Sequence, residues 1–278
     1  MTMQVKYASN PLDVKNYDTQ RLRSEFIFQS VFKPDSVGLA YSYQDRFIVG
    51  GVMPINQSVL LGNPAELRSG FFLERREMGI INVGGPGKIV ADNQVFEVDF
   101  KDSLYLGRGV KSVEFTSIHE NTPALFYLNS AQAHKEYPNK LITVRDADIT
   151  SAGTRENSNA RKIHKLIVNG LVQTCQLQMG LTELQPGSIW NTMPPHLHAR
   201  RNEVYFYFDI PQGHAVCHFM GEPSETRHIW LHNHEAVISP NWSIHSAAGT
   251  APYSFIWGMA GENLDYADMD AIDILALK

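Results

Sequence analysis

The chain has 278 residues, of which 43% are hydrophobic and 19% are charged, a composition typical of a globular protein with one large domain or two of average size. Its net charge of −5, without basic blocks, argues against a nucleic-acid partner. No segment approaches the roughly 20 apolar residues that span a membrane, and the charged N-terminus is unlike a signal peptide. Because two cysteines form no disulfide framework, we expect a cytoplasmic protein with no membrane partner.

The first 35 residues form a polar arm that contains a predicted helix. Asp18 is a suitable N-cap, and Leu22 and Phe26 supply an apolar face. The helix is expected to end near Pro34, because proline removes a helical hydrogen-bond donor.

Most of the remaining chain is predicted to be β-strand. Short apolar or alternating runs, separated by Gly, Pro, Asn and Asp, occupy residues 38–130 and recur after residue 160. Residues 131–160 are more polar and form a connector with one strand at 140–148. We therefore predict an all-β protein with few helices, built from two tandem jelly-roll barrels over residues 1–150 and 151–278. The first includes the arm and the connector.

Four residues of the second half have the spacing of a metal site. His196 and His198 share one face of a strand because they are two residues apart, Glu203 follows, and His245 lies farther along. Imidazoles and a carboxylate suit a divalent first-row ion, zinc before iron or manganese. A catalytic site must also leave room for substrate, which favours five or six ligands around the ion.

The other histidines fit a metal site less well. His232 and His234 also form a His-x-His pair, but they lack a carboxylate at the matching offset. Because the first half has no such pair, its barrel is expected to bind no metal and to serve as scaffold. Residues without ligand spacing are interpreted as solvated or structural: His119, His134, His214, His218 and His228.

The second half resembles a cupin. Gly187 precedes the histidine pair and Gly213 follows Glu203, as in the first cupin motif. The second motif is represented by Pro240 to His245, with Trp242 in place of the usual glycine. The spacing of the ligands is kept although the turn residue differs.

Three longer segments narrow the resemblance. RREMGIINVGGPG (75–87), NTMPPHLHARRNEVYFYFD (191–209) and residues 221–263 resemble the 5-keto-4-deoxyuronate isomerase family, also called 4-deoxy-L-threo-5-hexosulose-uronate ketol-isomerase. The resemblance implies a homo-oligomeric two-cupin enzyme with one zinc ion per subunit. It also implies that the enzyme converts 5-dehydro-4-deoxy-D-glucuronate into 3-deoxy-D-glycero-2,5-hexodiulosonate during pectin breakdown. The metal residues that it implies are His196, His198, Glu203 and His245.

Strand alternation predicts which side chains accompany Glu203. Tyr205 and Tyr207 would point into the barrel with it, where they could line a sugar pocket, while Val204 and Phe206 point outward. The alternative is that the tyrosines face solvent and the phenylalanines form the core.

A uronate also needs a cation for its carboxylate. Arg161 and Lys165 share a face if their segment is a strand, and Arg200 and Arg201 are further candidates. Each of the four is nearly as well explained as a solvated surface charge.

The residue that would move a proton during isomerisation is not identified by any motif. Tyr253, His164 and Glu262 are candidates, and a hydride shift would need no base. Two other functions share this fold and ligand set: an iron-dependent cupin dioxygenase and a non-catalytic sugar-binding cupin module.

Overall fold

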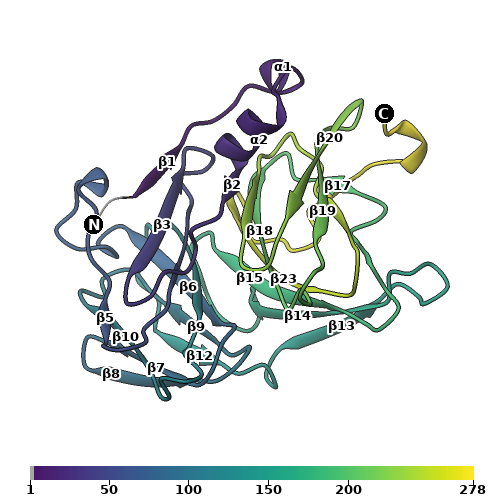
Figure 1. The fold of residues 1–278 in the computed structure, drawn as a ribbon. Helices are drawn as coiled ribbons and strands as arrows, with labels where there is room; N and C mark the ends of the chain where they lie inside the picture. The colour runs from purple at the N-terminus through teal and green to yellow at the C-terminus, as the bar shows by residue number, and fades with distance from the viewer. Residues whose placement is uncertain (1–2) are drawn as a thin grey trace.

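The computed structural model describes residues 3–278, which form two β-barrels side by side (Figure 1). Each barrel combines a seven-stranded sheet with a four-stranded sheet. The described chain has two short α-helices and two 3₁₀ turns, η1 (Ala65–Leu67) and η2 (Ile274–Ala276), so the predicted all-β class is confirmed. No helix in this part of the chain is long and apolar enough to cross a membrane.

The first barrel is formed by strands from the first half of the chain. Its seven-stranded sheet has the order β1 (Gln4–Lys6), β3 (Val37–Ser42), β4 (Ile48–Val52), β11 (Phe126–Gln132), β6 (Arg76–Asn82), β9 (Ser103–Leu106) and β12 (Lys140–Ile142). Its four-stranded sheet has the order β5 (Val59–Leu60), β10 (Val113–Ser117), β7 (Gly87–Ala91) and β8 (Gln94–Val98).

The second barrel repeats this arrangement. Its seven-stranded sheet has the order β13 (Asp148–Ala152), β14 (Arg161–Ile167), β15 (Gln178–Leu184), β23 (Ser254–Gly261), β18 (Arg201–Phe208), β21 (Ala236–Ser239) and β2 (Ile27–Phe28). The four-stranded sheet has the order β16 (Trp190–Asn191), β22 (Ser246–Gly249), β19 (Val216–Glu222) and β20 (Glu225–Leu231). A small sheet pairs β17 (His196–Leu197) with β24 (Asp270–Ala271).

The two barrels share one strand order, which reveals a repeat that the sequence does not show. From β3 and β14 onward, the successive strands of the two large sheets correspond one to one. In this correspondence β6 takes the place of β18. Met78 pairs with the last residue of β9, as Glu203 pairs with the last residue of β21. The first barrel therefore has a thioether where the second has a carboxylate.

The large sheets pack against each other through a shared hydrophobic cluster. Tyr127 of β11 stacks on Phe206 of β18, with ring centroids 4.4 Å apart. Val204 and Phe208 belong to the same cluster, whereas Tyr205 and Tyr207 belong to the interior cluster of the second barrel. Both faces of β18 are thus buried: one toward the barrel interior, the other toward the first barrel.

The N-terminal arm packs on the second barrel (Figure 1). It contains α1 (Pro11–Val14) and α2 (Thr19–Phe26), and Asp18 caps α2 by accepting a hydrogen bond from the Arg21 N–H at 2.7 Å. The cap is as predicted, but the expected extension toward Pro34 is wrong. Strand β2 begins directly after α2 because Ile27 and Phe28 pair with β21.

The connector holds two short strands instead of the single predicted one, β12 in the first large sheet and β13 in the second. Although the arm precedes the first barrel in the chain, its strand β2 completes a sheet of the second barrel. The division of the chain at residue 150 stays a prediction.

Candidate metal centre and adjoining cavity

Three structural units bring the predicted ligands together. Glu203 lies on β18 and points into the second barrel, where it is 4% exposed. His196 lies on β17 and His198 in the turn that follows it. His245 precedes β22 at the end of a turn in which the Ser243 N–H donates to the Pro240 carbonyl.

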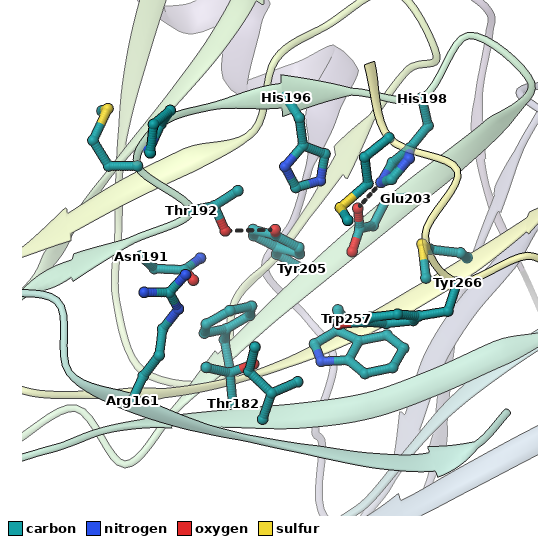
Figure 2. Close-up of a pocket in the computed structure, with 16 residues that line it drawn as sticks. Arg161, Thr182, Asn191, Thr192, His196, His198, Glu203, Tyr205, Trp257 and Tyr266 are labelled. Carbon is teal, nitrogen blue, oxygen red and sulfur yellow. Dashed lines mark hydrogen bonds and ion pairs between the residues drawn. The ribbon is translucent and has the colours of Figure 1, made fainter. Parts of the chain in front are cut away.

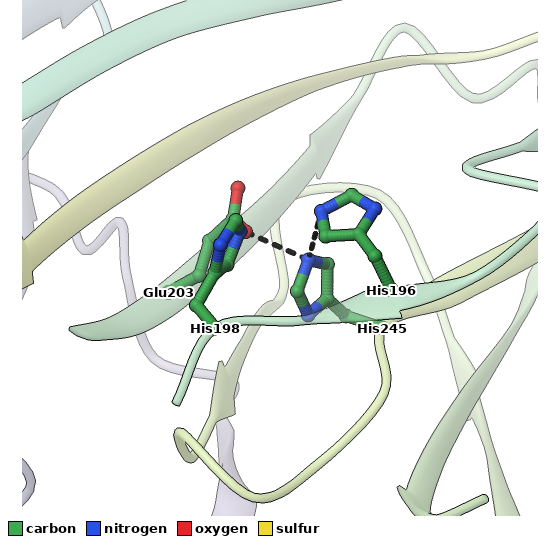
Figure 3. A group of neighbouring side chains, drawn as sticks. All are labelled: His196, His198, Glu203 and His245. Carbon is green, nitrogen blue, oxygen red and sulfur yellow. Dashed lines mark hydrogen bonds and ion pairs between the residues drawn. The ribbon is translucent and has the colours of Figure 1, made fainter. Parts of the chain in front are cut away.

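The four side chains converge inside the barrel (Figure 3). The Nε2 atoms of His196 and His245 are 3.0 Å apart. The Oε2 atom of Glu203 lies 2.8 Å from Nε2 of His245 and 3.0 Å from Nε2 of His198. One ligand atom from each residue lies within 4.8 Å of all the others.

This donor set fits a divalent metal ion. Ligand atoms bound at about 2.1 Å to one ion are roughly 3.0–3.4 Å apart in octahedral or tetrahedral geometry. The Nδ1 atom of His198 lies 2.8 Å from the carbonyl oxygen of Asp268 and can donate its hydrogen to it. That tautomer leaves the Nε2 lone pair of His198 free toward the other ligands.

The electrostatics of the cluster keep ligand lone pairs available. Burial, reinforced by neighbouring His245, lowers the pKa of His196 to about 2, so this imidazole is neutral at pH 7. Burial alone would raise the pKa of Glu203, but the neighbouring imidazoles of His245 and His198 hold it below its ordinary value. A neutral imidazole beside a carboxylate is the state that a metal ion requires.

The C-terminal segment covers the site and is held there by two arginines. Arg201, only 1% exposed, donates to the carbonyls of Asp265, Tyr266 and Asp268. Arg200 forms an ion pair with the carboxylate of Asp268. Because the Asp268 carbonyl also faces His198, these contacts fix the orientation of the His198 imidazole.

A cavity of about 260 Å³ adjoins the cluster (Figure 2). Its walls come from both sheets of the second barrel and from the C-terminal segment. They are lined by Arg161, Ile163, Thr182, Asn191, Thr192, Met193, Pro194, His196, His198, Glu203, Tyr205, Phe255, Trp257, Met259, Tyr266 and Met269. A cavity of this size suits a single small molecule.

Of the two predicted pocket tyrosines, the cavity wall includes only Tyr205. Its hydroxyl lies 3.2 Å from Oγ1 of Thr192. Tyr207 points into the same barrel, as strand alternation predicts, but it lies deeper, and its hydroxyl is 2.7 Å from Nδ1 of His218. Tyr207 is therefore not among the residues that line the cavity, and its contact with substrate stays a prediction.

Among the predicted cations, only Arg161 lines the cavity. Lys165 shares its strand face but is paired with Asp148 at 2.9 Å, outside the cavity. Arg200 and Arg201 hold the C-terminal segment instead. The expectation that Lys165 binds substrate is thus not supported by its position.

None of the three predicted proton-transfer residues lines the cavity. Tyr253 is buried against Tyr207, with ring centroids 5.6 Å apart. His164 lies 2.7 Å from the carboxylate of Glu183, on the opposite face of β14 from Arg161. Glu262 is exposed after the end of β23. The structure therefore does not bring these three residues to the cavity, and their role as a base stays a prediction.

Several residues that line the cavity were not predicted from the sequence. Phe255, Trp257 and Met259 alternate along β23, a period that predicts a common face once the strand is recognised. Asn191 and Tyr266 carry no such signal, because they lie in a two-residue strand and in the irregular C-terminal segment.

Trp242, the residue that departs from the cupin motif, does not require a glycine-like backbone. It is absent from the residues with positive φ among those described. Its ring packs edge-on against Phe26 of α2, at 6.3 Å between centroids. The tryptophan therefore joins the turn that carries His245 to the N-terminal arm.

Comparison with known proteins shows the family to which this chain belongs. A model of the KduI/IolB family matches residues 32–274, which include most strands of both barrels and all four clustered residues. The chain belongs to the KduI/IolB family.

Relatives of the KduI/IolB chain align over nearly its whole length. It is 53% identical over 275 residues to the 4-deoxy-L-threo-5-hexosulose-uronate ketol-isomerase of Bacteroides fragilis, covering 99% of this chain and 98% of that protein. It is 54% identical over 273 residues to the protein of the same name from Formosa agariphila, covering 98% of each.

Solved structures share the fold at low sequence identity. An IolB-like protein from Salmonella typhimurium superposes with a TM-score of 0.65 at 16% identity, covering 92% of this chain and 91% of that one. The oxalate decarboxylase of Lactobacillus farciminis gives a TM-score of 0.57 at 10% identity, covering 81% and 79%. These likenesses support the predicted cupin fold.

Proposed function

We propose that this protein is a zinc-dependent ketol-isomerase that interconverts 5-dehydro-4-deoxy-D-glucuronate and 3-deoxy-D-glycero-2,5-hexodiulosonate. The observation that carries the proposal is the His196, His198, Glu203 and His245 cluster beside a cavity of about 260 Å³. The names of full-length relatives at 51–54% identity supply the reaction and the substrate.

The side chains of the cavity have separate roles in such a reaction. His196, His198, Glu203 and His245 would hold one zinc ion per subunit. When bound, the ion would act as a Lewis acid toward the carbonyl and adjacent hydroxyl oxygens of the substrate. Phe255, Trp257 and Met259 would exclude water from the reacting carbons.

Tyr205 and Thr192 are positioned to orient substrate hydroxyls. Burial, followed by the nearby Glu203 carboxylate, raises the pKa of Tyr205 well above its ordinary value, so its hydroxyl is a neutral donor at pH 7. A neutral phenol can donate a hydrogen bond to a sugar oxygen without becoming a base.

The setting that accompanies this function is also a proposal. A sugar-acid isomerase of this kind would act in the cytoplasm on uronates released from pectin, with a small-molecule substrate and a homo-oligomeric assembly. Size-exclusion chromatography with light scattering measures the assembly directly.

The first prediction concerns the metal ligands. We expect His196→Ala and His245→Ala each to remove most bound zinc and to lower isomerase activity at least about 100-fold, because each deletes one of four ligands. Elemental analysis of the purified protein, together with an NMR assay of uronate conversion, measures both effects.

The matched control is His228→Ala, which removes an exposed histidine on β20. It should retain zinc and activity. Full zinc occupancy and full rate in both ligand variants would refute the site. Oxygen consumption during turnover, or iron instead of zinc in the purified protein, would favour the dioxygenase alternative.

A further inference from the structure

Arg161 presents a cation to the cavity without a counter-charge from the described chain. Its guanidinium makes one hydrogen bond, from Nη1 to the Asn159 carbonyl at 2.9 Å, and takes part in no ion pair among residues 3–278. A guanidinium has five N–H donors, so most of them are free. Figure 2 shows the side chain reaching into the cavity from β14.

The surroundings of Arg161 are apolar or neutral. Burial lowers the pKa of Arg161, and the titratable groups that act on it are Tyr205, Tyr266 and Tyr253. Burial raises the pKa of all three phenols, so they are uncharged at pH 7. A partly buried cation among neutral groups is costly unless a ligand supplies the negative charge.

The other basic residues near the site already have partners. Lys165 is paired with Asp148, and Arg200 with Asp268 and Asp270. Arg201 donates to three backbone carbonyls. Arg161 is therefore the cation that remains available to a ligand in this part of the described chain.

Two further donors among the residues that line the cavity lack partners. The side-chain amide nitrogen of Asn191 and the indole nitrogen of Trp257 are buried and have no hydrogen-bond partner within the described residues. Asn191 is 1% exposed, and Figure 2 shows it beside the guanidinium of Arg161. Orphaned buried donors in a cavity are typical of sites that a ligand completes.

We propose that Arg161 and Asn191 bind the carboxylate of an open-chain sugar acid. Figure 2 shows them across the cavity from His198 and Glu203, so a bound acid would direct its carbonyl end toward the metal ligands. This inference rests on the proposed function for its substrate class. It makes Arg161 the residue that selects an acid over a neutral sugar.

Binding of non-isomerisable probes tests the acid site apart from catalysis. D-Gluconate and D-sorbitol are linear six-carbon molecules that differ in the carboxylate. We expect the zinc-loaded wild-type protein to bind D-gluconate more tightly in calorimetry, and Arg161→Met to lose roughly 10- to 100-fold of that affinity. Equal binding of both probes by the wild type would overturn the proposal.

Kinetics provide the second readout. For the ketouronate, Arg161→Met should raise KM roughly 10- to 100-fold with kcat little changed, because the lost contact is made equally in the ground and transition states. Arg161→Lys should fall between wild type and Arg161→Met, because it keeps the charge but not the two parallel hydrogen bonds. An unchanged KM in Arg161→Met would contradict the assignment.

Lys165→Met is the matched control, since it removes a cation from the same face of the same strand, outside the cavity. It should match the wild type in probe binding and KM. If the wild type selects gluconate through Arg161 but does not isomerise the ketouronate, the proposed function fails and the acid site stands. If it isomerises the ketouronate with a KM that does not depend on Arg161, the proposed function stands and the acid site fails.

Discussion

Glu77 is a buried carboxylate that accepts most of its hydrogen bonds from the other half of the chain. It has no exposed surface. Its oxygens accept hydrogen bonds from the backbone N–H groups of Cys175, Gln176 and Leu177 at 2.7–2.8 Å, and from the Tyr105 hydroxyl at 2.8 Å. One side chain of the first barrel thereby fixes the segment that leads into β15.

Glu77→Gln is expected to destabilise the protein by roughly 3 kcal/mol, because the new amide would turn an N–H group toward backbone donors that then lose their acceptor. Chemical denaturation followed by tryptophan fluorescence measures the change. Glu97→Gln, on the exposed face of β8, is the control and should stay within about 0.5 kcal/mol of the wild type. Equal stability of the two variants would show that the hydrogen bonds of Glu77 do not stabilise the fold.

The individual residues of the cluster were the part of the site that could best be predicted from the sequence. The spacing of His196, His198 and Glu203 predicted that they lie together, and strand parity predicted that Tyr205 points into the barrel. Parity could not separate Tyr205 from Tyr207, since both point the same way. Their depth is set by the contact between Tyr207 and His218, which no local pattern reveals.

At the scale of elements, the two large sheets approach closely where glycines face the opposite sheet. A Cβ on Gly79 of β6 would lie 2.4 Å from the sulfur of Met179, and a Cβ on Gly258 of β23 would lie 2.0 Å from Oδ1 of Asn129. Each glycine therefore makes room for a side chain of the other barrel.

Gly79→Ala and Gly258→Ala are each expected to destabilise the protein by about 1–3 kcal/mol, because the added methyl group overpacks a filled interface. Gly70→Ala is the control: it is exposed, and its new Cβ would lie 3.8 Å from the nearest atom, Oε2 of Glu74. Thermal unfolding of the three variants ranks them. A Gly258→Ala protein as stable as Gly70→Ala would show that the sheets can separate without cost.

The predictions of secondary structure were wrong or incomplete where pairing with distant residues decides the local structure. The helix over the arm was expected to continue past Phe26, but Ile27 and Phe28 pair with β21 instead. The C-terminal segment has no periodicity, and hydrogen bonds from Arg201 place Tyr266 over the cavity. The strand character of a segment is encoded locally, whereas these positions depend on partners far away in the chain.

At the scale of the whole molecule, a charged cluster also joins the barrels. Lys101, from the turn between β8 and β9, lies 2.5 Å from Glu183 of β15, and His164 lies 2.7 Å from the same carboxylate. Asp209 is a weaker partner of Lys101, at 3.5 Å. Hydrogen bonding from His164, with further help from Lys101, lowers the pKa of Glu183 to about 2 despite partial burial.

This shift predicts how acid weakens the barrel contact. A carboxylate whose folded pKa is depressed stabilises the fold above its unfolded pKa of 4.5 and loses that contribution as pH falls toward about 2. Wild type and Glu183→Gln should therefore differ in urea midpoint at pH 6 and converge as the pH falls toward 2. Glu97→Gln should show no such convergence, and a pH-independent gap for Glu183→Gln would rule out the linkage.

The arm that crosses to the second barrel has a consequence for the timing of assembly. Arg227 of β20 donates to the carbonyl of Lys15, 212 residues earlier, and β2 cannot pair until β21 exists. At about 5–20 residues per second, the arm waits on the ribosome for roughly 10–40 s before these partners are made. The barrel that carries the four clustered residues thus closes after the first barrel, and a nascent chain acquires its site only after His245 has been synthesised.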